Sequence, residues 1–107
     1  MSEPVSMAKW YPTTNPHHLR RLGKSIEELG ELIAVLARIQ IQGIDSIDPA
    51  SGKTNRQRMH EETGDVLAQF ACNLEVFDMD TGAIDERTQM KVKWMEQWEA
   101  HFTDEQG

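Results

Sequence analysis

Acidic residues recur in two segments of the chain with the same pattern. The segments 27–31 (EELGE) and 61–65 (EETGD) each place two glutamates shortly before a further acid. If each segment is helical, residues three positions apart share one face, with side-chain origins about 5–6 Å apart. The resulting pairs are Glu28 with Glu31 and Glu62 with Asp65. Facing pairs would supply the oxygen ligands that hard cations such as Mg²⁺ or Mn²⁺ prefer.

Two interpretations of these acids remain open at this point. A solvated acidic face is the usual explanation of a single Glu-x-x-Glu on a helix. Four clustered carboxylates without a counter-ion would instead repel one another, by about 3 kcal/mol per pair at ~5 Å and an effective dielectric of ~20. Two matching segments on successive helices favour a carboxylate site that binds metal ions and, through them, a polyphosphate. Spacing alone does not decide between a solvated face and a cleft.

The first acidic segment lies within a long predicted helix from Pro16 to Gln42. Asn15 is a suitable N-cap with Pro16 at the first helical position, and Gly43 is a natural stop. Apolar residues recur at intervals of three and four, which predicts an amphipathic helix. They are Leu19, Leu22, Ile26, Leu29, Ile33 and Leu36.

Two further helices are predicted, and no segment alternates with the period of a strand. A loop of turn-forming residues, 44–53, precedes a helix that begins at Thr54 or Asn55 and ends near Phe77. A turn at 78–82 then leads to a third helix, from about Ile84 to Phe102. The chain is therefore expected to be all-α, a bundle of long helices.

Length and composition limit the class of protein. The chain has 107 residues, which predicts one domain: an irregular segment 1–15, a helical core 16–102 and a frayed tail 103–107. A formal net charge of −7 makes binding of nucleic acid or an anionic membrane unfavourable. One cysteine and no apolar leader favour a reduced, cytoplasmic setting. A domain this small buries only about two thirds of its unfolded surface, so a partner chain is expected to complete the core.

The two acidic segments resemble the signature of the MazG-like all-α nucleoside triphosphate pyrophosphohydrolases. That superfamily includes dimeric dUTPases and phosphoribosyl-ATP pyrophosphohydrolase, and its signature is EExxE followed by ExxD on consecutive helices. The resemblance covers about residues 17–102. The 30 residues between Glu31 and Glu62 are more than many members have, and the extra length falls in the loop 43–54.

The resemblance implies a fold, a reaction and a set of ligands. The fold would be a helical bundle whose four-helix core is completed by dimerisation, often with further pairing to tetramers. The reaction would be Mg²⁺-dependent cleavage of a (deoxy)nucleoside triphosphate to the monophosphate and pyrophosphate, with an activated water attacking the α-phosphorus; Mn²⁺ is a substitute. Carried over by position, the metal ligands would be Glu28, Glu31, Glu62 and Asp65. Glu27 and Glu61 would lie just outside them, as supporting groups or as candidate bases.

Several other residues are candidates to meet the substrate. Lys24, one turn before Glu28, would contact phosphate or simply form an ion pair with that glutamate. The basic residues of the third helix that would meet phosphate are less clear, and Lys91 and Lys93 are the nearest candidates. Trp10, His18 and Asn73 are candidates to meet the base, although Trp10 could equally pack over a bundle end. The competing hypothesis is an inactive helical oligomerisation or nucleotide-binding module of the same fold.

Overall fold

The computed structural model describes residues 9–102, which form three helices and their connections. The helices are α2 (Pro16–Gln42), α3 (Asn55–Val76) and α4 (Thr81–Ala100). Chain contacts divide the protein into two units, one ending at Phe77 and one beginning at Asp78. Residues 1–8 of the predicted irregular start, and the whole of the predicted frayed tail (103–107), lie outside the described residues.

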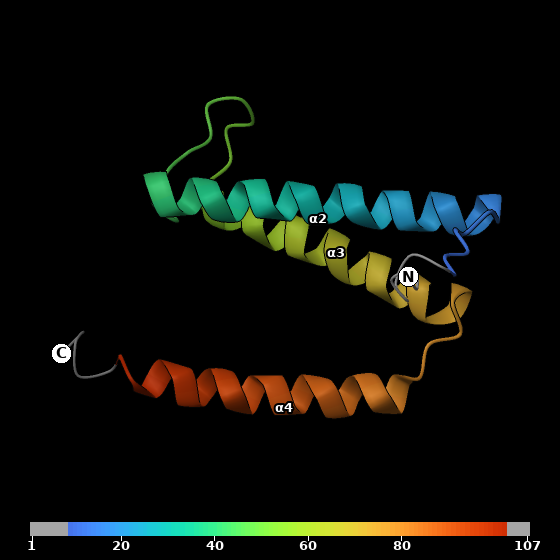
Figure 1. Ribbon diagram of the computed structural model, residues 1–107. Helices are drawn as coiled ribbons and strands as arrows, with labels where there is room; N and C mark the ends of the chain where they lie inside the picture. The colour runs from blue at the N-terminus through green and yellow to red at the C-terminus, as the bar shows by residue number, and fades with distance from the viewer. Residues whose placement is uncertain (1–8, 103–107) are drawn as a thin grey trace, which may run out of the picture. The chain divides into compact units, whose positions relative to one another are not determined.

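The first unit is a hairpin of two helices. Figure 1 shows α2 and α3 side by side, running in opposite directions, with the loop between them at one end. The caps of α2 are those the sequence predicts: the Asn15 side chain accepts hydrogen bonds from the amides of His17 and His18, and the Gly43 amide donates to the Ile39 carbonyl. Thr54 and Gln57 form a capping box at the start of α3.

The loop between α2 and α3 is closed by its own hydrogen bonds. Ile47 and Thr54 form an isolated antiparallel bridge, and the Asp48 amide donates to the Lys53 carbonyl at 2.7 Å. The first residue of α3, Asn55, is fully buried, and its Nδ2 donates to the Gly43 carbonyl at 2.9 Å. The end of α2 and the start of α3 are therefore fastened together by one side chain.

Burial in the hairpin follows an unusual pattern. Among the described residues, the only buried apolar side chains are Val35 and Val66, whereas Ser25, Glu28, Asn55 and Glu62 are buried polar residues of the same two helices. The apolar stripe of α2, the six residues from Leu19 to Leu36 named above, remains 37–69% exposed. Most of the fully buried residues of the hairpin are thus polar, whereas the apolar stripe of α2 is left partly exposed to solvent.

The second unit is the helix α4. It begins three residues before the predicted start because the Asp80 side chain caps it, accepting a hydrogen bond from the Ala83 amide at 3.0 Å. Trp98 and Phe102 pack edge to face, with ring centroids 5.0 Å apart. None of the described helices has the length and apolar character needed to cross a membrane.

Candidate metal centre

The two acidic segments come together between α2 and α3. Glu28, Glu31, Glu62 and Asp65 each offer a carboxylate oxygen, and these four oxygens lie within 4.8 Å of one another. Each helix contributes one buried glutamate and one exposed acid: Glu28 and Glu62 are buried, and Glu31 and Asp65 are exposed. The acids therefore form a cluster with an inner pair and an outer, solvent-facing pair.

The inner pair has unused hydrogen-bonding capacity. Glu28 is 8% exposed and Glu62 is 9% exposed, and in each the Oε2 atom is buried without a hydrogen-bond partner. A buried carboxylate oxygen that lacks a partner is costly, because it has lost its water and gained nothing in return. Two such oxygens beside two further acids fit a hard divalent cation, which takes carboxylate oxygen ligands.

A basic residue one turn earlier in the helix accompanies each inner glutamate. Lys24 Nζ lies 3.4 Å from Glu28 Oε1, and Arg58 Nη2 lies 3.7 Å from Glu62 Oε1. Both contacts reach Oε1 and leave Oε2 free. Of the two roles that the sequence leaves open for Lys24, the structure contains the ion pair. Hydrogen bonds to Glu27 and then to Glu28 raise the pKa of the Lys24 ammonium above its ordinary value.

The two candidate bases, Glu27 and Glu61, are half-exposed and paired with lysines. Glu27 Oε1 lies 3.3 Å from Lys24 Nζ, and Glu61 Oε1 lies 2.8 Å from Lys53 Nζ. Neither belongs to the cluster of four converging oxygens. Each precedes one of the two buried glutamates of the cluster in the sequence.

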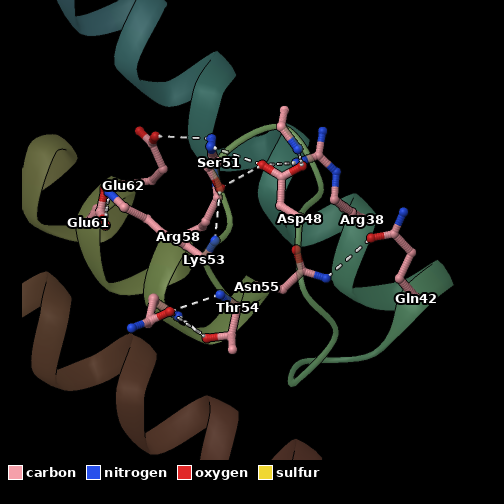
Figure 2. Close-up of polar contacts among 12 residues, drawn as sticks. Arg38, Gln42, Asp48, Ser51, Lys53, Thr54, Asn55, Arg58, Glu61 and Glu62 are labelled. Atoms are coloured by element: carbon pink, nitrogen blue, oxygen red, sulfur yellow. Dashed lines mark hydrogen bonds and ion pairs between the residues drawn. The ribbon is translucent and has the colours of Figure 1, made fainter.

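A buried aspartate in the loop is part of the site's surroundings and was not predicted from the sequence. Asp48 is 6% exposed and accepts hydrogen bonds from Ser51 Oγ at 2.9 Å and from the Ala50 amide at 3.2 Å. These hydrogen bonds, followed by the nearby charges of Arg38 and Arg58, lower the pKa of the Asp48 carboxyl below its ordinary value. Figure 2 shows this carboxylate facing Arg38 and Arg58, and the latter lies between Asp48 and Glu62.

A signal for Arg58 does exist in the sequence. It stands four residues before Glu62, as Lys24 stands four residues before Glu28, so the segments 24–31 (KSIEELGE) and 58–65 (RMHEETGD) share one pattern. Asp48 has no comparable signal, because an aspartate in a run of turn-forming residues is ordinary.

Of the residues predicted to meet the substrate, Asn73 lies in the hairpin near the acidic cluster, whereas Lys91 and Lys93 belong to the other unit. Asn73 of α3 donates from Nδ2 to Ser25 Oγ at 2.9 Å. Ser25 lies on α2, one turn before Glu28. The ring of His18 lies 4.8 Å from that of Phe77 (centroid to centroid), and Trp10 is 75% exposed. Lys91 and Lys93 belong to α4, in the other unit, where Lys91 Nζ lies 5.5 Å from the centroid of the Trp94 ring.

Comparisons of the chain with known protein families, with curated proteins and with solved structures find no match.

Proposed function

We propose that this protein is a Mg²⁺-dependent nucleotide pyrophosphohydrolase that converts a nucleoside triphosphate to the monophosphate and pyrophosphate. One observation carries the proposal: four carboxylate oxygens from two matching segments lie within 4.8 Å of one another. The resemblance of those segments to the MazG-like signature supports the choice of reaction. The cluster alone supports a divalent cation, and the signature adds the nucleotide.

The proposed metal ligands are Glu28, Glu31, Glu62 and Asp65. The free Oε2 atoms of the two buried glutamates and the exposed positions of the other two acids suit a cation that also faces a ligand in solvent. When bound, Mg²⁺ would offset the negative charge of the phosphates and lower the pKa of a water molecule. The same donor set accepts Mn²⁺.

The chain's own residues would orient the substrate and balance its charge. Lys24 has three N–H donors and is half-exposed, so it can reach a phosphate oxygen without leaving the neighbourhood of Glu28. Glu27 and Glu61 flank the cluster at a place where a carboxylate could hold a water molecule or accept its proton. Asn73 would offer an amide to the base.

We further propose that a second copy of the chain completes the helical core. Two buried valines are a small apolar core for helices of 27 and 22 residues, and the apolar stripe of α2 is unburied. Packing two hairpins stripe to stripe would give a four-helix core with the acidic clusters away from the interface. A chain that is monomeric in solution, by light scattering, would contradict this.

The experiment that tests the function is pyrophosphate release from a panel of ribo- and deoxynucleoside triphosphates, with Mg²⁺ and with chelator. We expect Mg²⁺-dependent release of one pyrophosphate per monophosphate. Glu62→Gln is expected to abolish turnover while leaving the oligomeric state intact. Glu75→Gln, the same change at an exposed position of α3, is the matched control and should leave turnover unchanged.

The outcomes separate the competing functions. Turnover in Glu62→Gln at the parent rate would show that the metal ligands are wrongly assigned. Release of inorganic phosphate instead of pyrophosphate would show a different cleavage. If no nucleotide of the panel is cleaved but Mg²⁺ raises the melting temperature of the parent and not of Glu62→Gln, the metal ligands are correctly assigned. Two options then remain, a modified nucleotide outside the panel, which this result favours, and an inactive module of the same fold.

A further inference from the structure

We propose that Asp48 is a positioning residue for the metal site: it holds Arg58 so that this arginine touches only one oxygen of Glu62. This inference rests on the proposed function, because it assigns Asp48 a role toward the metal that the acidic cluster would bind. It concerns a loop residue outside both acidic segments.

The geometry of Arg58 carries the inference. Its guanidinium is divided between two carboxylates, with Nη1 3.4 Å from Asp48 Oδ2 and Nη2 3.7 Å from Glu62 Oε1 (Figure 2). An arginine and a carboxylate that meet without competition commonly form two parallel hydrogen bonds, one to each oxygen. Because Asp48 occupies one arm of the guanidinium, the other arm reaches Oε1, and Glu62 Oε2 remains without a partner.

Asp48 is itself held in place on several sides. Ser51 Oγ and the Ala50 amide donate to it, and Arg38 Nη1 of α2 lies 3.8 Å from the same Oδ2 atom that faces Arg58. The carboxylate therefore connects the loop to an arginine on each helix. Its burial, at 6% exposed, leaves it little freedom to turn away.

The other helix contains a parallel arrangement. Lys24 Nζ is shared between Glu28 at 3.4 Å and Glu27 at 3.3 Å, and Glu28 Oε2 is again free. On each helix, the basic side chain that pairs with the buried glutamate also pairs with a second carboxylate, which is not part of the cluster. For Glu62 that second carboxylate comes from the loop.

Loss of the Asp48 charge should therefore let Arg58 close over both oxygens of Glu62 and compete with a metal. Asp48→Asn keeps an oxygen that accepts from the Ala50 amide, and its new Nδ2 can donate to Ser51 Oγ, whose hydroxyl then accepts instead of donating. The turn therefore keeps both contacts, while the negative charge that attracts Arg58 is lost. Groups that touch a metal's ligands typically change metal affinity about 10- to 100-fold when they are mutated. We expect Mn²⁺ to bind Asp48→Asn on the order of tenfold more weakly.

The test is Mn²⁺ titration of the full chain without nucleotide, by calorimetry, with circular dichroism to verify folding. Asp45→Asn is the matched control: it removes the same charge from the same loop, but Asp45 pairs with Arg56, 3.0 Å away, and not with Arg58. The Mn²⁺ affinity of Asp45→Asn should stay within about twofold of the parent's, because an exposed ion pair contributes little. The decisive variant is Asp48→Asn in an Arg58→Met background, where the tenfold loss should shrink to within about twofold.

Each result supports or overturns the inference. Equal losses in Asp48→Asn and Asp45→Asn, or a loss that persists in the Arg58→Met background, would overturn it while leaving the proposed function standing. A parent chain that binds no Mn²⁺ would overturn both. If Asp48→Asn does not fold, Ser51→Ala provides the test: it loosens Asp48 without removing its charge and should weaken Mn²⁺ binding in the same direction, to a smaller degree.

Discussion

Replacing one inner glutamate should change the stability of the protein in opposite directions with and without metal. Glu62 has three acidic neighbours whose ligand oxygens lie no more than 4.8 Å from its own. At an effective dielectric of ~20 each such pair costs about 3.5 kcal/mol, and in bulk water about 1 kcal/mol. Assigning the lower value to the exposed Glu31 and Asp65 gives a total repulsion of about 5 kcal/mol.

The attraction that opposes this repulsion comes from Arg58. Its Nη2 lies 3.7 Å from Glu62 Oε1, which corresponds to about 4.5 kcal/mol at the same dielectric of ~20. Repulsion therefore exceeds attraction by roughly 1 kcal/mol. Removing the charge of a buried carboxylate that has one unpaired oxygen stabilises the chain further. We expect Glu62→Gln to stabilise the metal-free chain by about 1 kcal/mol or more, equivalent to a rise of at least about 4 °C in Tm for a domain of this size.

Saturating Mg²⁺ should reverse the order of the two proteins. A ligand at 100 times its Kd stabilises the folded state by about 2.7 kcal/mol, which only the parent can gain. The assay is thermal unfolding by circular dichroism, in chelator and in Mg²⁺, with Glu75→Gln as the control, expected to shift stability by less than about 0.5 kcal/mol in either condition. A Glu62→Gln chain that melts below the parent in chelator would refute the reasoning, because the attraction of Arg58 would then outweigh the repulsion.

Three further predictions concern the loop, the helix junction and the apolar stripe. Because the folded chain lowers the pKa of Asp48 below its ordinary value of 3.8, this residue should contribute stability above that pH and lose it as the pH falls through the lowered pKa. The stability advantage of the parent over Asp48→Asn should therefore shrink in urea titrations as the pH is lowered below about 4; an advantage that grows on acidification would contradict the assignment. Asn55→Ala should lower the free energy of unfolding by about 1–3 kcal/mol, because it removes a fully buried amide that donates to the Gly43 carbonyl. Urea unfolding measures the change, and an unchanged midpoint would be evidence against this role. Ile33→Lys changes a stripe residue that is 65% exposed and should convert an oligomer to single chains, as measured by light scattering. Ile41→Lys, at a position 85% exposed and outside the stripe, should leave the oligomer intact. An oligomer that persists in Ile33→Lys would place the interface elsewhere.

Local signals in the sequence predict the helices well. Asn15, Pro16 and Gly43 act within one turn of the helix ends, so the bounds of α2 are those expected. The start of α4 differs because Thr81 and Gly82 resemble a turn, whereas Asp80 caps the helix ahead of them. A capping aspartate and a turn aspartate look alike in sequence, since both use the same side-chain oxygen.

The candidate site is predictable only in part. Helical spacing pairs Glu28 with Glu31 and Glu62 with Asp65, and the structure brings both pairs together. Spacing does not show which acid of each pair is buried, because burial depends on how α2 and α3 face one another. The Asp48 network escapes prediction for a different reason: its carboxylate reaches Arg38 and Arg58 only through the path of the loop backbone.

The loop between α2 and α3 therefore does more than span a distance. The loop's path places Asp48 beside Arg58, and the bridge and the capping box hold that path. A peptide tag or reporter inserted between Ile47 and Thr54 should therefore disturb the acidic cluster without touching it. A homologous chain whose shorter loop lacked Asp48 would need another way to restrain the arginine before Glu62. Covariation between loop length and the residue at position 58 is the evolutionary trace that such a dependence would leave.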